Sequence, residues 1–209
     1  MSFVDPAFTG FSAPGTTNDD HPPADIRAGD AFLADVFFAV ANGPQPQWSS
    51  TVFIVTYDEW GGFFDHVAPP RVAAANGASD IDQDQINGKT LLGFRVPTIV
   101  ASPFSRGDAG DPKVKGMTFD HTSILKLIEW RFGLDALTAR DASHDVQNLA
   151  RALNFHTANV AVPTLPHPTA PAQTPCVQPD PPAPSSLADS TNPWLSVRGS
   201  GLLQGWNIQ

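Results

Sequence analysis

Charged side chains and cysteine are scarce in this chain of 209 residues. Charged residues make up only 16% and the formal net charge is -9, which argues against nucleic acid as the main partner, because that affinity comes largely from Lys and Arg. Cys176 is the only cysteine, which excludes an intrachain disulfide and a thiolate metal cluster. No stretch reaches the roughly 18 consecutive apolar residues of a membrane span. Residues 1–5 show no signal peptide, and the compartment stays undecided.

A hydrophobic content of 41% is typical of a globular α/β protein. The spacing of apolar residues predicts helices over residues 25–41, 124–131 and 145–153, with Asp25 as the N-cap of the first. Apolar runs predict strands over residues 51–57 and 94–101. Residues 68–92 are predicted to form a long surface loop. We therefore expect a folded domain over 1–162, a Pro-rich linker over 163–186 and a short tail over 187–209.

The strand predicted over residues 51–57 ends in two adjacent carboxylates, Asp58 and Glu59. Its continuous apolar character indicates a strand buried on both faces, as in a parallel sheet, and sites of such sheets lie beyond the carboxyl ends of their strands. Gly61 and Gly62 permit the bend that would let both carboxylates face one ion. The pattern favours a site for a hard divalent cation. The alternative is an N-cap or a surface turn.

Three other clusters combine acids with histidine, and oxygen and imidazole ligands together suit a divalent ion. The first is Asp20 with His21, for which the alternative is a histidine in a rigid extended loop, because two prolines follow. In the second, the carboxylate of Asp65 could serve only to orient the ring of His66. In the third, Asp120 could simply cap the next helix, which leaves the role of His121 open.

These motifs occur in an order that resembles a known family. Residues 56–67 resemble the signature of the bacterial phosphoesterases that include non-haemolytic phospholipases C and an acid phosphatase. Residues 18–23 resemble the upstream histidine motif of that family, and residues 96–107 and 119–123 resemble its downstream blocks. The resemblance extends over about residues 3–155.

The resemblance implies an alkaline-phosphatase-like α/β fold, with a mostly parallel sheet flanked by helices, and hydrolysis of phosphate monoesters or phospholipids. It implies that Asp58 and Glu59 bind a divalent metal, which could be Mg, Mn, Ca or Zn. His21 would contact the phosphoryl group. The remaining candidates would lie in the same pocket or support its ligands: Asp20, Trp60, Asp65, His66, Asp120 and His121.

The chain departs from the family pattern in two respects. Many relatives have histidine where this chain has Trp60, so this position cannot be a ligand here. Relatives are also longer and often exported, and carry upstream an Asn-Arg-Ser-Phe-Asp-type metal-binding segment and a Ser or Thr nucleophile. We therefore expect a C-terminal portion, incomplete at its N-terminus. The alternatives are a truncated, non-catalytic remnant that binds a metal or a partner and, more weakly, a glycosidase that uses Asp58 and Glu59.

Overall fold

The computed structural model describes residues 1–8, 17–22, 24–44, 47–76, 85–105, 114, 116–170 and 172. The chain divides into two units, Met1–Pro171 and Ala172–Gln209, and all that follows concerns the first. The predicted tail over 187–209 lies outside the described residues, and so does most of the predicted linker. Among the described helices, none combines the length and the apolar character that crossing a membrane requires.

The first long element is helix α1, Ile26–Asn42. It begins as predicted at Asp25, whose side chain accepts a hydrogen bond from the backbone N–H of Arg27 and so satisfies a free donor of the first turn. Its buried face carries Phe37 and Ala41, which pack against Trp48 of the short 3-10 helix η1, Trp48–Ser50. The predicted helix is confirmed, and its first residue, Ile26, is exposed.

Strands β1, Phe53–Thr56, and β4, Thr98–Ala101, form a two-stranded antiparallel sheet, with Phe53 opposite Ala101 and Thr56 opposite Thr98. This corrects two expectations, that these strands belong to a parallel sheet and that they are buried on both faces. The strands are only half-buried or exposed. A short apolar run indicates a strand, but it specifies neither the direction nor the number of its partners.

The antiparallel pairing also changes where the predicted motifs lie. In a parallel pair, the segments that follow both strands would share one end of the sheet. Here Ser102, which follows β4, lies at the opposite end of the sheet from Asp58, which follows β1. The residues close to the end of β1 are instead those that precede β4, such as Val96 and Pro97.

The segment expected as an irregular loop contains a second antiparallel pair, β2, Arg71–Ala73, with β3, Lys89–Leu91. A bridge joins Ile86 to Lys89 around Asn87 and Gly88, both of which have positive φ, 53° and 74°. Positive φ at both central residues is the geometry of a type I′ turn, which Asn-Gly favours. The Asn-Gly pair was the sequence signal for this turn.

Helix α2, Thr122–Phe132, follows the third cluster of acid and histidine and ends at Gly133 in the left-handed conformation. The helix predicted over 145–153 is wrong in its extent. The chain instead forms α3, Ala139–Ala142, and a 3-10 turn η3, Leu149–Ala152. The side chain of Asn148 caps η3, which explains why helix begins only after this residue.

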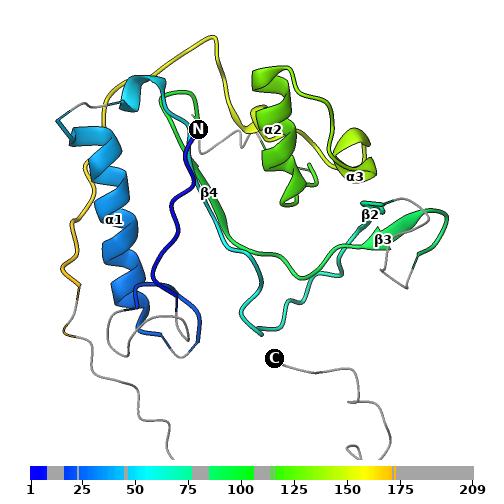
Figure 1. The fold of residues 1–209 in the computed structure, drawn as a ribbon, viewed down its shortest axis with the longest axis horizontal. Helices are drawn as coiled ribbons and strands as arrows, with labels where there is room; N and C mark the ends of the chain where they lie inside the picture. Colours follow the sequence, from blue (N-terminus) through cyan, green and yellow to red (C-terminus); the bar gives the residue numbers. More distant parts are fainter. Residues whose placement is uncertain are drawn as a thin grey trace, which may run out of the picture. The chain divides into compact units, whose positions relative to one another are not determined.

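The two long helices flank the β1–β4 pair (Figure 1). Near one end of this sheet, Phe53 and Ala101 pack against the apolar cluster of α1 and η1. Near its other end, Thr98 and Val100 line a small cavity together with Ile124 of α2. The end of β1 therefore lies where residues from the N-terminal loop, from both sheet strands and from α2 can meet.

Candidate functional site

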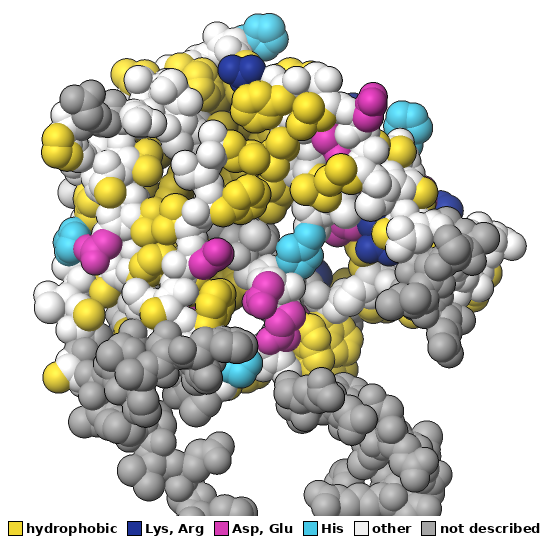
Figure 2. Space-filling view, in the orientation of Figure 1, with side chains coloured by type: hydrophobic (Ala, Val, Ile, Leu, Met, Phe, Trp, Pro, Cys, Tyr) yellow, Lys and Arg dark blue, Asp and Glu magenta, His cyan; other side chains and the backbone are white. Residues whose placement is uncertain are grey.

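The segment that follows β1 bends sharply at the two glycines, as predicted. Gly61 and Gly62 have φ of 69° and 78°, which side chains disfavour. Asp58 and Glu59 are both exposed. Glu59 Oε2 accepts a hydrogen bond of 2.8 Å from the N–H of Gly61, so this carboxylate is directed back toward the turn. Figure 2 shows acidic and histidine side chains close together on one face of the molecule, beside apolar surface.

Tyr57 connects the end of β1 to the N-terminal loop. Its hydroxyl donates a hydrogen bond of 2.6 Å to Asp20 Oδ2. This bond, together with burial and the negative charges of Asp20 and Asp30, raises the pKa of Tyr57 to about 12. Because the phenol stays protonated, it acts as a permanent hydrogen-bond donor to the carboxylate.

Asp20 is seated against helix α1. A Cβ at Gly29 would lie 2.1 Å from Asp20 Oδ1, so only glycine leaves room for the carboxylate at this turn of the helix. Asp20 Oδ1 is buried and has no hydrogen-bond partner in the described part of the chain. A buried oxygen without a partner is costly, and the hydroxyl of Tyr57 offsets part of that cost at Oδ2.

His121 reaches the same strand end from the start of α2. Its Nε2 lies 2.7 Å from the backbone oxygen of Tyr57. A carbonyl oxygen can only accept, so Nε2 carries the proton, and Nδ1 of the neutral ring is the acceptor. Asp20, Tyr57 and His121 thus join three segments that are far apart in the sequence.

Asp120 caps α2, which confirms the capping alternative. Its Oδ1 accepts hydrogen bonds from the N–H of Thr122 at 2.8 Å and from the hydroxyl of the same residue. The backbone N–H of Asp120 donates to Ser123 Oγ, which completes a reciprocal cap. Asp120 Oδ2 is buried without a hydrogen-bond partner among the described residues, and the nearest cation is Arg140, with Nη1 at 3.9 Å.

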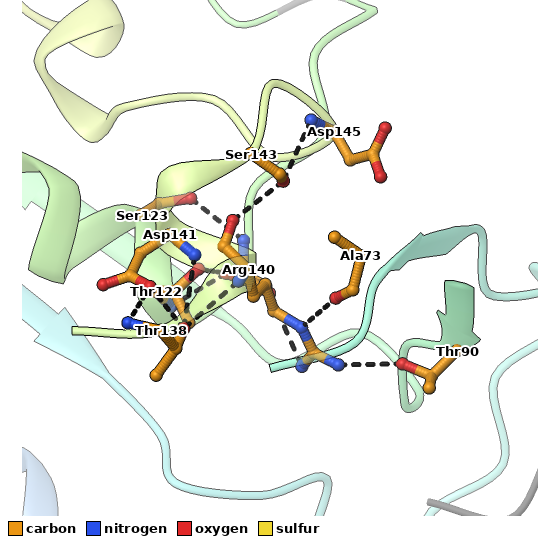
Figure 3. Close-up of polar contacts among 10 residues, drawn as sticks. Ala73, Thr90, Thr122, Ser123, Thr138, Arg140, Asp141, Ser143 and Asp145 are labelled. Atoms are coloured by element: carbon orange, nitrogen blue, oxygen red, sulfur yellow. Dashed lines mark hydrogen bonds and ion pairs between the residues drawn. The ribbon is translucent and has the colours of Figure 1, made fainter. Parts of the chain in front are cut away.

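Arg140 is the residue that ties the start of α2 to the β2–β3 pair (Figure 3). Its Nε donates to the backbone oxygen of Ala73 at 2.9 Å, and its Nη2 donates to Thr90 Oγ1 at 2.8 Å. Thr90 is fully buried, so its hydroxyl depends on this partner. No motif marked Arg140 in the sequence, because its partners lie 50 and 67 residues away.

Asp65 pairs with Arg95 rather than with His66. The guanidinium donates from Nε and Nη2 to the two carboxylate oxygens at 2.8 and 2.9 Å, and the N–H of Val67 donates to Oδ1. These bonds hold the pKa of Asp65 well below its usual value. His66 Nδ1 lies 3.9 Å from Asp65 Oδ1, beyond hydrogen-bond distance. No hydrogen bond joins Asp65 to the ring of His66 here, so the role of Asp65 in orienting that ring stays a prediction.

Two cavities adjoin this strand end. The larger, about 540 Å³, combines acidic, basic and aromatic side chains, and Trp60 packs edge-on against Phe94 beside it. Five of its lining residues are Asp20, Tyr57, Glu59, Asp65 and Arg95. The smaller, about 170 Å³, is mostly apolar and is lined by Asp120 and His121. Three of the predicted site residues line neither cavity: His21, Asp58 and His66.

The comparison with known sequences decides the family. The profile of the Phosphoesterase family matches residues 1–135. The chain belongs to the phosphoesterase family. The predicted resemblance is thereby confirmed. The match extends over more than half of the chain. It includes the three motifs that carry the resemblance in the sequence, residues 18–23, 56–67 and 119–123.

Several relatives of this phosphoesterase chain are phospholipases by name. Phospholipase C B of Mycobacterium tuberculosis is 40% identical over 168 residues, which cover 74% of this chain and 31% of that protein. Non-specific phospholipase C6 of Arabidopsis thaliana is 38% identical over 132 residues, 60% of this chain and 25% of that protein. Non-hemolytic phospholipase C of Burkholderia pseudomallei is 35% identical over 164 residues, 70% of this chain and 23% of that protein. The chain thus spans less than a third of these relatives' lengths.

The side chains that the structure describes in this phosphoesterase chain do not form a complete metal site. Among the described residues, no group of three or more His, Cys, Asp or Glu is placed to hold an ion. Asp58 and Glu59 are exposed neighbours, and His21 is an exposed residue whose Nδ1 lies 2.7 Å from the backbone oxygen of Pro22. Two carboxylates supply only part of the six to eight oxygens that Ca²⁺ takes, and only two of the ligands of a closed four-ligand Zn²⁺ site.

Proposed function

We propose that this chain forms part of a phosphate ester hydrolase of the phospholipase C or acid phosphatase type. The observation that carries the proposal is the family match over residues 1–135. The geometry supports it, because Asp20, Tyr57 and His121 bring the matched motifs to one strand end beside a cavity of about 540 Å³. This volume suits a small ligand or the head group of a phospholipid.

In this proposal, His21 contacts the phosphoryl oxygens or gives a proton to the leaving group. His21 is exposed, and its Nδ1 donates to the backbone oxygen of Pro22, so the role proposed for Nε2 as a donor requires the doubly protonated imidazolium. Arg95 lines the larger cavity, but Asp65 occupies two of its donors. Any phosphate contact by Arg95 would use the remaining N–H groups.

The attacking hydroxyl is proposed to come from a segment that this chain does not contain, as in the family pattern. Ser102 does not serve, because it is buried and its hydroxyl donates to the backbone oxygen of Thr51 at 2.7 Å. The hydroxyl of Thr56 is paired with that of Thr98 at 3.0 Å. Asp58 and Glu59 are proposed as two of the ligands of a divalent metal, whose other ligands the described residues do not supply.

The experiment is a chimera. The matching third of the mycobacterial phospholipase C B would be replaced by the homologous residues of this chain, and hydrolysis of para-nitrophenyl phosphate and para-nitrophenyl phosphorylcholine would be measured with Mg²⁺, Mn²⁺, Ca²⁺ and Zn²⁺. We expect hydrolysis, and we expect His21→Ala to lower the rate about 10²–10⁴-fold, the usual contribution of a positioned proton donor. His156→Ala is the matched control, since His156 is an exposed histidine outside both cavities.

A folded chimera that hydrolyses neither ester, beside an active parent enzyme, would refute the proposal. It would favour the alternative of a non-catalytic remnant that binds a metal or a partner. Titration of each metal into the 209-residue chain, with Asp58→Asn as the comparison, then tests that alternative directly. Binding that disappears in the variant supports the remnant, and the absence of binding refutes it.

A further inference from the structure

Three contacts form a continuous path from helix α1 to the ring of His121. Gly29 provides the space that Asp20 Oδ1 occupies, because a Cβ there would lie 2.1 Å away. Asp20 Oδ2 accepts from the hydroxyl of Tyr57 at 2.6 Å. The backbone oxygen of Tyr57 then accepts from Nε2 of His121 at 2.7 Å. Each contact restricts the next group along the path.

We propose that Asp20 is a positioning residue for His121. By anchoring the ring of Tyr57, Asp20 fixes the backbone oxygen of Tyr57, which accepts the proton that His121 carries on Nε2. Nδ1 of His121 is then left as the open acceptor of the site. Neither the family match nor the proposed hydrolysis assigns this role to Asp20. The proposal concerns the geometry of His121 and holds for any ester that the site cleaves.

The position of Tyr57 in the fold explains why its side chain needs an anchor. The hydrogen-bonded ladder between β1 and β4 ends at the pair Thr56 and Thr98, so the carbonyl of Tyr57 lies one residue beyond it. No strand partner fixes the direction of this carbonyl. Its orientation therefore depends on other contacts of Tyr57, whose ring is held by Asp20.

The other side of His121 is open. The residue is exposed, and Nδ1 has no hydrogen-bond partner among the described residues. The backbone of His121 is fixed, because the residue occupies the turn before α2 and its backbone oxygen accepts from the N–H of Ile124. A neutral imidazole fixed by a carbonyl at Nε2 presents a directed lone pair at Nδ1, which can accept a proton or a hydrogen bond.

The test is nuclear magnetic resonance of the imidazole groups in the complete 209-residue chain. In the wild-type protein we expect the neutral ring of His121 to carry its proton on Nε2, with an observable Hε2 signal protected by the bond to Tyr57. In Asp20→Ala and in Tyr57→Phe we expect this proton to exchange with water about tenfold faster, the factor that corresponds to one lost hydrogen bond. The two variants remove opposite ends of the same contact.

Two further variants separate positioning from mere loss of structure. Asp20→Asn keeps an oxygen that accepts from Tyr57, and it should preserve the Hε2 signal. Asp35→Ala removes an exposed carboxylate of α1 whose partner is His167, and it should also preserve the signal. If Asp20→Ala does not fold, Tyr57→Phe decides alone, since it removes only a hydroxyl. An unchanged Hε2 signal in Tyr57→Phe would overturn the proposal, and so would a wild-type ring with its proton on Nδ1.

Discussion

Gly29→Ala in helix α1 is the substitution whose effect is most sharply defined by the structure. Position 29 is the fourth residue of α1, where alanine normally stabilises a helix by about 1 kcal/mol relative to glycine. Here the new Cβ would lie 2.1 Å from Oδ1 and 2.9 Å from Cγ of Asp20. The helix propensity and the steric contact therefore act in opposite directions on the free energy of unfolding.

The steric term should win. Asp20 has a short side chain held at its other oxygen by Tyr57, so it cannot move away without losing that hydrogen bond. Overpacking of a well-filled site costs about 1–3 kcal/mol, against the gain of about 1 kcal/mol from propensity. We expect the variant to be less stable than wild type by about 0–2 kcal/mol. Removing the carboxylate should reverse the sign, so that Gly29→Ala stabilises the Asp20→Ala protein by about 1 kcal/mol.

The assay is urea unfolding of four proteins, the wild type, both single variants and the double variant, at a pH near 7. The double-mutant cycle should yield a coupling of about 1–3 kcal/mol between positions 20 and 29. Ala39→Gly, on the exposed side of α1, measures the propensity term in the same helix and should cost about 1 kcal/mol. If Gly29→Ala stabilises the wild type as much as it stabilises Asp20→Ala, the carboxylate is not seated against Gly29 and the reasoning fails.

Three further expectations concern stability and pH. Arg140→Ala should lower the free energy of unfolding by about 2–4 kcal/mol, because it leaves the buried Thr90 hydroxyl without its partner and removes the cation beside Asp120 Oδ2; a loss below about 1 kcal/mol in urea unfolding would contradict this. The pKa of Asp65 is lowered from its usual 3.8, so its stabilisation is present above pH 3.8 and is lost as the pH falls further. Asp65→Asn should therefore be less stable than wild type at pH 7, and unfolding curves measured below pH 3.8 should converge; a constant difference would refute the assignment. Phe37→Ala should cost about 3–5 kcal/mol in the same assay, because it opens a cavity in the α1–η1 cluster, whereas a loss below about 1 kcal/mol would place Phe37 outside a packed core.

Local features of the site could be predicted from the sequence because they depend on neighbouring residues. Asp25 caps α1 and Asp120 caps α2, and both positions were recognisable from a short polar side chain before a helical pattern. Gly61 and Gly62 bend the chain after β1, which two consecutive glycines indicated. Each of these features involves side chains and backbone groups within a few residues of each other.

Contacts between distant residues were not predictable in the same way. The salt bridge between Asp65 and Arg95 spans 30 residues, and the sequence suggested the adjacent His66 instead. The hydrogen bond from Tyr57 to Asp20 spans 37 residues, and the contact of His121 with Tyr57 spans 64. No periodicity records such pairings, because they depend on how the loops return to the sheet.

By itself, the sequence determined the family, the chemistry of the candidate residues and the positions of the two long helices, since these follow from motif order, side-chain type and local spacing. The tertiary structure alone decided that β1 and β4 run antiparallel, which separates Ser102 from Asp58 and brings Val96 toward the end of β1. It also decided that Asp20, Tyr57 and His121 form one path. The physical reason is that strand direction and side-chain pairing are set by long-range contacts, which no short segment of the chain contains.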